Sequence, residues 1–268
     1  MMWKSEWASQ WARWTVVSEG AGKEYQVPNS AFWLNTEIAE RVLGFPAPVP
    51  IFYEHIMIDG KKMSASLGNV VYPKEWLECG PAELLRFFYN KRLMKTRSFS
   101  WKDLPVLFSD YEKHADVYFG KLKVENEKEE AHMKRLFEIS QLEKPKPVDM
   151  PFEKAVMAAN TEPSKKGLMI TYASNWMEKH SPESRVKLLD APEKTALPKG
   201  MKEALKALVK SLQDATTEEE ITNAVWDAAR FSGNPREFFR SAYLALIGRE
   251  QGPRLGPFIM AAGKKKVI

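Results

Sequence analysis

The sequence predicts a mainly α-helical protein with a partial α/β region at its amino-terminal end. Three observations lead to this prediction. Apolar residues recur at helical spacing through most of the chain, and a strand-like apolar segment, residues 51–58, lies in the first quarter. The prolines Pro145, Pro147 and Pro151 mark a linker past the middle of the chain. The expected domains are residues 1–75, residues 76–150 and residues 151–268.

The first region is expected to alternate a helix with a strand. Its helix is indicated by the apolar positions Leu34, Ile38, Val42 and Leu43, and Gly44 ends it. The strand over residues 51–58 leads into Asp59-Gly60, a dipeptide that closes tight hairpins. A loop of lysines and serines therefore leaves a sheet edge immediately before a helix that opens near Trp76.

The second and third regions are expected to be helical. Gly80-Pro81 starts one helix, and Ser100 with Asp103 resembles the cap of the next. Met133, Leu136 and Phe137 form a narrow apolar stripe in a highly charged segment. In the third region, Thr217 with Glu220 fits a capping box before the apolar stripe Ile221, Ala224, Val225, Ala228 and Ala229. Gly233 then stops that helix, and Asn234-Pro235 starts another with Phe238, Phe239, Ala242, Tyr243 and Leu246 inside it.

Composition limits the classes of protein that fit. The 268 residues carry a formal charge of +5 and a pI near 9.0, which suits a polyanionic partner without requiring one. The single cysteine, Cys79, excludes a disulfide framework and a cysteine-rich zinc site, and is best read as a small buried apolar residue. No run approaches the ~20 apolar residues of a membrane span. We therefore expect a cytoplasmic protein with no membrane contact and no metal site of its own.

Several short motifs occur in an order and spacing that resembles a known family. They are Trp3-Lys4-Ser5-Glu6-Trp7, Gly22-Lys23-Glu24-Tyr25, Tyr53-Glu54, Lys62-Met63-Ser64-Ala65-Ser66 and the tail Gly252-Pro253-Arg254-Leu255-Gly256-Pro257. Together they resemble the second half of a class I lysyl-tRNA synthetase across nearly the whole chain. The resemblance implies a partial Rossmann-like catalytic region, a helical segment that contacts the tRNA stem, and an α-helical cage that binds the anticodon.

The resemblance implies roles for the Lys/Ser loop. In that family the loop closes over ATP, and its ammonium groups neutralise charge on the α-phosphate and the departing pyrophosphate. The catalytic candidates are Lys62, Ser64 and Ser66, and the ATP-binding candidates are Lys61, Lys62, Met63, Ser64, Ala65 and Ser66. Ala65 and Leu67 depart from the family pattern, because neither position supplies the second lysine. Read by itself, the loop is equally well a solvated charged turn.

The resemblance also implies a lysine pocket with aromatic walls. These correspond to Trp3, Tyr25 and Tyr53, and an aromatic face attracts an ammonium ion through cation–π interaction. Tyr25 departs from the family, which normally has histidine there. We interpret the other amino-terminal tryptophans, Trp7, Trp11 and Trp14, as packing residues.

For tRNA binding, the resemblance indicates basic and aromatic residues in two places. The candidates are Lys91, Arg92, Lys95 and Arg97 after a helix of the second region, and Arg230, Phe231, Arg236, Arg240, Arg249 and Arg254 in the third. For each one, a solvated charge or a packed aromatic is the alternative reading.

The family's His-x-Gly-His-type signature is missing from this sequence. The four histidines, His55, His114, His132 and His180, lie in other contexts. We therefore expect the carboxy-terminal half of an enzyme whose first half is a separate polypeptide or is lost, and an isolated chain without activity. Such a half should expose an apolar patch and an unpaired strand near residues 51–58.

Three functional hypotheses follow. The first is half of a lysine–tRNA ligase, which activates lysine with ATP, brings Mg²⁺ in with that substrate, and transfers lysine to tRNA(Lys). The second is a non-catalytic tRNA-binding module that keeps the helical cage. The third is a different nucleotidyl-transfer enzyme of the same superfamily.

Overall fold

The computed structural model describes residues 3–162, 164–189, 198 and 200–267, with only the backbone described at Trp3 and Lys4. The chain divides into two compact units. The first is built from Met1–Trp76, Pro81–Asp103 and His114–Pro145, and the second from Leu77–Gly80, Leu104–Lys113 and Lys146–Ile268. Helices dominate both units and the small sheets belong to the first, which confirms a mainly α protein with an α/β amino-terminal part.

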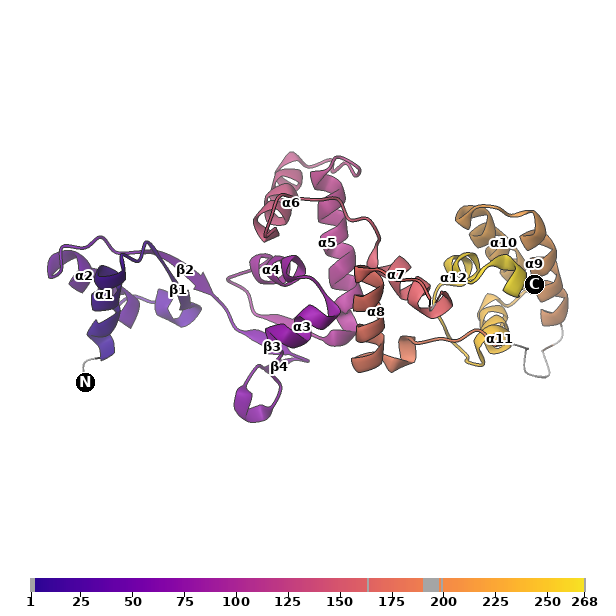
Figure 1. Ribbon diagram of the computed structural model, residues 1–268, viewed down its shortest axis with the longest axis horizontal. Helices are drawn as coiled ribbons and strands as arrows, with labels where there is room; N and C mark the ends of the chain where they lie inside the picture. Colours follow the sequence, from indigo (N-terminus) through magenta and orange to yellow (C-terminus); the bar gives the residue numbers. More distant parts are fainter. Residues whose placement is uncertain (1–2, 163, 190–197, 199, 268) are drawn as a thin grey trace. The chain divides into compact units, whose positions relative to one another are not determined.

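The elements of the first unit follow one another along the chain as shown in Figure 1. They are α1 (Trp3–Trp14), β1 (Ser18–Gly22), a 3₁₀ turn (Lys23–Gln26), α2 (Ala31–Arg41), β2 (Val49–Tyr53), β3 (Ile56–Ile58), β4 (Lys61–Lys62), a 3₁₀ turn (Ala65–Leu67), α4 (Ala82–Asn90), β5 (Arg97–Phe99), a 3₁₀ turn (Trp101–Asp103) and α6 (Glu127–Ser140). Two helices contribute residues to both units, namely α3 (Pro73–Cys79) and α5 (Leu104–Tyr118).

The second unit is helical throughout its described elements. These are α7 (Phe152–Thr161), α8 (Leu168–Lys179), a 3₁₀ turn (Pro182–Ser184), α9 (Met201–Asp214), α10 (Glu218–Phe231), α11 (Pro235–Ile247), α12 (Leu255–Ala262) and α13 (Lys264–Val267).

A parallel β–α–β arrangement opens the first unit. β1 and β2 pair in parallel, in register from Ser18 opposite Val49 to Gly22 opposite Tyr53, and α2 makes the crossover. α1 packs beside α2, and together with β1 they enclose a core of Ala8, Trp11, Ala21, Phe32 and Ala39. The Trp11 indole donates to Glu19 Oε2 at 3.0 Å, so the one polar atom of this ring is satisfied inside the core.

One expectation about this region is confirmed and one is wrong. The helix indicated by Leu34, Ile38, Val42 and Leu43 is found as α2, which ends at Arg41; Ile38 packs against the core, whereas the other three side chains are exposed. The strand expected over residues 51–58 is two strands, β2 and β3, which belong to different sheets.

The prediction that the amino-terminal tryptophans are packing residues holds for two of the three. Trp11 is buried and Trp7 packs against its ring at a centroid distance of 6.1 Å, which confirms their reading as packing residues. Trp14 is 67% exposed, so the same reading is wrong for the last tryptophan of α1.

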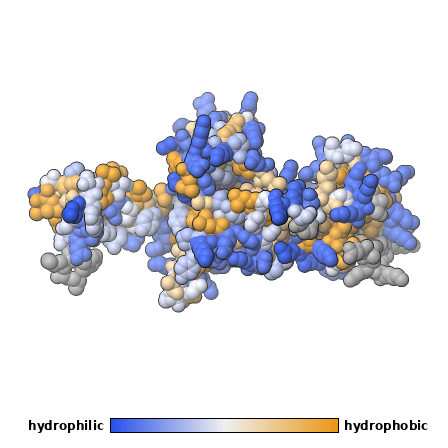
Figure 2. Space-filling view, viewed as in Figure 1, coloured by the Kyte–Doolittle hydropathy of each residue, from blue (hydrophilic) through white to orange (hydrophobic). Residues whose placement is uncertain are grey.

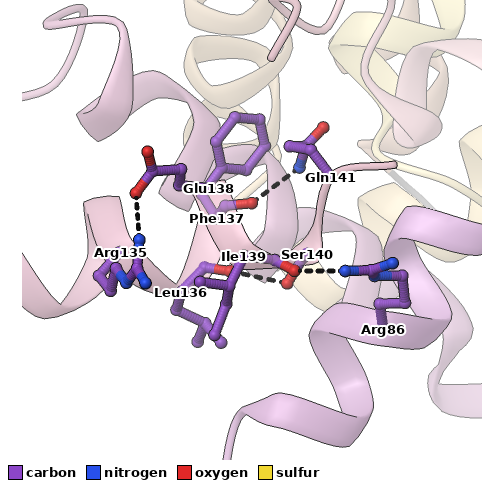
Figure 3. Close-up of polar contacts among 8 residues, drawn as sticks. All are labelled: Arg86, Arg135, Leu136, Phe137, Glu138, Ile139, Ser140 and Gln141. Carbon is purple, nitrogen blue, oxygen red and sulfur yellow. Dashed lines mark hydrogen bonds and ion pairs between the residues drawn. The ribbon is translucent and has the colours of Figure 1, made fainter. Parts of the chain in front are cut away.

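The rest of the first unit is a three-stranded sheet, ordered β4-β3-β5, with α4 packed on α6. Met133, Leu136 and Phe137 are buried in α6, as their spacing predicts. Arg86 of α4 donates to the Ile139 carbonyl oxygen at 2.8 Å, next to the hydrogen bonds that close the last turn of α6 (Figure 3). This guanidinium satisfies a carbonyl that the end of the helix leaves free.

The second unit has a core that joins α9 to α12. Ile221, Ala224, Val225, Ala228 and Ala229 are buried on one side of α10, as predicted. The capping box is also confirmed, because Thr217 Oγ1 accepts from the Glu220 amide and the Glu220 carboxylate accepts from the Thr217 amide at 2.9 Å.

Cys79, at the end of α3, is fully buried, as expected of a small apolar residue. Across the described residues, no helix is both long enough and apolar enough to cross a membrane.

Candidate functional site

The Lys/Ser loop begins on the hairpin that the sequence predicts. β3 and β4 pair antiparallel, with Met57 opposite Lys62 and Ile58 opposite Lys61. Asp59 and Gly60 close the turn with φ of 49° and 75°, the left-handed pair that a two-residue hairpin needs. The hairpin therefore fixes where Lys62 leaves the sheet.

Two hydrogen bonds from the Asn69 side chain to the backbone stabilise the conformation of the loop. Asn69 Oδ1 accepts from the Ser64 amide at 2.9 Å, and its Nδ2 donates to the Lys62 carbonyl oxygen at 3.0 Å. Gly68, at φ 68°, turns the chain back so that this side chain can reach both groups. The sequence interpretation missed Asn69, and the Gly-Asn pair after the loop was the available signal.

The loop presents a small group of phosphate-compatible side chains. The hydroxyls of Ser64 and Ser66 lie 2.9 Å apart, and Lys61 and Lys62 are exposed to solvent. An ammonium group beside two hydroxyl donors can engage phosphate oxygens. The departure at Leu67 is visible in the structure, because this apolar side chain is 70% exposed where a lysine was expected.

The aromatic candidates belong to the other sheet. Tyr53 ends β2 and is 46% exposed, and its ring passes over Gly20, where a Cβ atom would lie 3.5 Å from Tyr53 Cε1. Tyr25 lies in the 3₁₀ turn after β1, partly buried, with its ring centroid 5.1 Å from that of Trp7. The side chain of Trp3 lies outside the described residues. The Lys/Ser loop and the two tyrosines therefore start from different sheets.

An ion pair ties the turn after β1 to the end of β2. Lys23 Nζ lies 3.2 Å from Glu54 Oε2. The His55 amide donates to the Glu54 carboxylate and, together with Lys23, lowers the pKa of Glu54 below its ordinary value. Glu54 is therefore held as an anion, and its charge is balanced by Lys23.

The basic segment after α4 does not act as one unit. Arg97 donates to the carbonyl oxygens of Phe88 and Tyr89 and lies over both rings, with its guanidinium carbon 5.2 and 5.9 Å from their centroids. Burial lowers the pKa of Arg97. Its Nη1 atom donates inside the fold and the side chain is partly buried, so this residue is a weaker phosphate candidate than the exposed Arg92 and Lys95. Lys91 Nζ lies 5.9 Å from the centroid of the Phe87 ring.

The candidates on α10 and α11 combine aromatic and cationic side chains at the surface. Phe231 is 68% exposed, Arg230 pairs with Asp227 at 3.2 Å, and Arg236 is exposed. Trp226, which is not among the residues predicted from the sequence, is 47% exposed and packs edge-on against Phe239 at a centroid distance of 5.2 Å. Its place among the small apolar residues of α10 suggests a core residue, so the sequence offered no signal for it.

The remaining arginines of the second unit are engaged by acidic or backbone oxygens. Arg240 lies 2.5 Å from Glu250, whose hydrogen bond and charge raise the pKa of Arg240. Arg249 donates to the Glu183 carbonyl oxygen at 2.6 Å. Arg254 is 3.8 Å from Glu153, with both side chains well exposed. Exposed pairs of this kind are weak and can be exchanged for phosphate contacts.

Comparison with known proteins identifies the family. A family model described as "tRNA synthetases class I (K)" matches residues 1–143, which include the Lys/Ser loop and both tyrosines. The chain belongs to this family.

Curated relatives cover the whole chain. A lysine–tRNA ligase of Thermococcus kodakarensis is 29% identical over all of this chain and 58% of its own length. Those of Methanopyrus kandleri and Thermoplasma volcanium are 29% and 30% identical, over 99% and 100% of this chain and 54% and 57% of their own lengths. The chain thus spans less than three fifths of each relative and matches their carboxy-terminal part.

Among the described residues, no group of three or more His, Cys, Asp or Glu side chains is arranged to hold a metal ion.

Proposed function

We propose that this chain is the carboxy-terminal part of a class I lysine–tRNA ligase. It supplies the ATP loop, one wall of the lysine pocket and the tRNA-binding helices, and works with an amino-terminal catalytic part. The match over residues 1–143, which contains the hairpin and loop around Lys62, is the observation that supports this most strongly. The partial Rossmann-like character of the first unit rests on the parallel β1–α2–β2 arrangement.

In this proposal the loop stabilises the transition state of lysine activation. The lysine carboxylate attacks the α-phosphorus of ATP, the bond to the β-phosphate oxygen breaks, and pyrophosphate leaves with its Mg²⁺, which enters with the substrate. Lys62 lies beside the departing pyrophosphate, and Ser64 and Ser66 donate to phosphate oxygens. Lys61 and the loop backbone from Met63 to Ala65 line the same path.

Lysine binding in this proposal uses charge and aromatic faces together. Tyr53 ends β2 and Glu54 follows it in the sequence, and an aromatic face and a carboxylate both attract an ammonium group. Tyr25 and Trp3 complete the aromatic wall. tRNA(Lys) contacts Lys91, Arg92 and Lys95 with its stem, and its unpaired anticodon bases stack near Phe231 and Trp226.

The test is lysine-dependent exchange of pyrophosphate into ATP. We expect no exchange by the isolated chain, and exchange when it is combined with the amino-terminal part of a related ligase. In that combination, Lys62→Ala should lower the rate on the order of 10²-fold, because a charge is lost at the developing pyrophosphate. Lys102→Ala removes an exposed lysine outside the loop and should leave the rate unchanged. Equal rates for both variants would exclude this role for Lys62.

A non-catalytic tRNA-binding module is the second candidate. The exposed Leu67 in the loop favours it, because the loop then carries less positive charge than catalysis needs. Binding of tRNA(Lys) with a steep dependence on salt, but no exchange in any combination, would select this candidate.

A further inference from the structure

An apolar cavity lies among the last helices of the second unit. Its volume is about 390 Å³, within the range of about 300–1,000 Å³ typical of ligand pockets. The described residues that line it come from α9, α11, α13 and the segment Leu188–Leu189, and all of them except Lys266 are apolar. Neither the Lys/Ser loop nor the tRNA-binding residues proposed above belong to this cavity.

Two sets of hydrogen bonds fix the walls of the cavity. The Leu189 amide donates to the Leu246 carbonyl oxygen at 2.8 Å, which attaches the segment before α9 to the end of α11. Lys264 Nζ donates to the carbonyl oxygens of Gln213 and Ala215, which attaches α13 to the end of α9. The cavity is therefore preformed, and a ligand does not have to order its walls.

Three exposed lysines border the cavity. Lys202 and Lys206 each come three residues before a lining residue of α9, namely Leu205 and Val209, so they are surface neighbours of the lining. Lys266 lines the cavity itself. We call Lys202, Lys206 and Lys266 the basic rim. Because Leu205 and Val209 are only partly buried, apolar side chains and ammonium groups are open to solvent together.

The acidic residues near the two ends of α9 point away from the cavity. At 3.6 residues per turn, Glu203 and Asp214 lie about 120° or more around the helix axis from the two lining residues named above. The two lysines of α9 in the basic rim lie only about 60° from them. Figure 2 shows apolar residues among hydrophilic ones over the helices of the second unit. The side of α9 that borders the cavity is therefore positively charged.

We propose that the cavity and the basic rim form a docking site for an acidic amphipathic helix of a partner protein. The apolar side chains of that helix enter the cavity, and its carboxylates pair with the basic rim. Lys202 and Lys206 are four residues apart, about 6 Å along α9, which equals the spacing of two carboxylates at i and i+4 on a helix that lies along α9. This inference is separate from the proposed function, because it involves neither ATP nor tRNA.

Two other ligands use only one part of this surface. RNA phosphates would pair with the lysines but leave the cavity empty. A base inside the cavity would lose its hydrogen bonds, because the described lining offers no polar side chain other than Lys266. A neutral apolar helix would fill the cavity but cover the ammonium groups without a counter-charge. A helix with carboxylates beside apolar side chains satisfies both parts.

The experiment measures binding of a synthetic helix to the full chain. The probe is a lactam-bridged peptide of 14 residues, the length of α9, with leucines on one side and glutamates at i and i+4 beside them. We expect saturable binding in fluorescence anisotropy that weakens with salt, and slower hydrogen exchange of the α9 and α11 amides. The double variant Lys202→Glu/Lys206→Glu should weaken binding about tenfold or more, since like charges then meet. Lys102→Glu/Lys123→Glu reverses two exposed lysines of the first unit and should leave binding unchanged.

The role of the cavity is tested separately. Ala245→Phe fills it from α11 and should also weaken binding about tenfold or more, with circular dichroism to check folding. Two altered peptides test the same points without changing the chain. One has glutamine in place of glutamate, the other has serine in place of leucine, and each should bind about tenfold more weakly or worse than the probe.

No binding of the probe, or equal binding of the probe and either altered peptide, overturns the inference. Unchanged binding to a folded Ala245→Phe variant, or equal weakening by the two charge reversals, overturns it as well. If single-stranded oligouridine binds more tightly than the probe and loses that binding in Lys202→Glu/Lys206→Glu, the basic rim is a surface for RNA and the inference is wrong.

Discussion

The amino-terminal β1–α2–β2 region and the helical region from α9 to α12 bury their apolar residues to different extents. Each of α9 to α12 turns its apolar side toward the others, and together they bury Leu208, Val225, Phe238 and Ile259 among many others. The amino-terminal region buries a smaller set around Trp11 and Phe32 and leaves Val49, Ile51 and Leu34 exposed. Among the described residues, the helical region thus buries the larger apolar core, whereas the β1–β2 pair leaves the side with Val49 and Ile51 exposed.

The difference follows from how each type of element is covered. A helix has one apolar side, so a few helices can cover each other. A strand in a parallel sheet has two apolar sides and two edges, so it needs neighbours in every direction. A two-stranded parallel sheet therefore leaves more of its apolar side chains exposed than a group of packed helices does.

The largest expected effect tests whether the helical region really has its own core. Phe238→Ala removes a fully buried ring from α11 and should cost about 3–5 kcal/mol of the free energy of unfolding, because it leaves a cavity between the helices. Phe231→Ala, at a 68% exposed position of α10, should change it by less than about 0.5 kcal/mol. Denaturant unfolding, with hydrogen exchange to assign the signal to α9–α12, measures both. If both variants lose the same free energy of unfolding, the helices α9–α12 do not have a core of their own around Phe238.

A second, smaller effect tests the amino-terminal core. Asn35 is buried in α2, accepts from the Ala8 amide at 2.9 Å and donates to the Ala31 carbonyl oxygen at 2.7 Å. Asn35→Ala should cost about 1–3 kcal/mol, because it removes the polar link between α1 and α2. The readout is the opening free energy of the α1 and α2 amides in hydrogen exchange.

The control for Asn35 is Glu37→Ala, which removes an exposed side chain of the same helix. If the two variants lower the opening free energy of the α1 and α2 amides equally, the hydrogen bonds of Asn35 do not stabilise this core.

Local signals in the sequence predicted the helical region well. The capping box at Thr217, the start at Asn234-Pro235 and the burial of Phe238 are all found as expected. Each of these depends on residues within about one turn of a helix, so the sequence contains what determines them. The hairpin turn at Asp59-Gly60 was predictable for the same reason.

Features set by distant contacts were harder to predict. The periodicity of Leu34 and Val42 correctly indicated a helix, but not that its buried side would be the one bearing Phe32. Arg97 Nη1 donates to the carbonyl oxygens of Phe88 and Tyr89, which only the folded chain reveals. In the candidate site, the motif selected Lys62 and its serines, whereas the hydrogen bonds of Asn69 are seen only in the folded loop.

The smallest effect concerns how acid acts on the helical region. The amides of Thr216 and Thr217, with the Thr216 hydroxyl, donate to the Glu220 carboxylate and lower its pKa to about 2. In the unfolded chain this carboxyl has its ordinary pKa of 4.5. Above that value both states are ionised and the full stabilisation is present. As the pH falls through 4.5 toward about 2, the unfolded state takes up the proton first, so the stabilisation is progressively lost.

Glu220→Gln removes this titration, so the variant should be less stable than the wild type at pH 7, and the gap should close as the pH approaches 2. Glu219→Gln removes a carboxylate from the same turn, and the free energy of unfolding of this variant should depend on pH as that of the wild type does. Unfolding of the two variants and the wild type between pH 7 and pH 2.5 measures this. If the difference in the free energy of unfolding between Glu220→Gln and the wild type stays constant with pH, the capping box does not determine how acid destabilises α10.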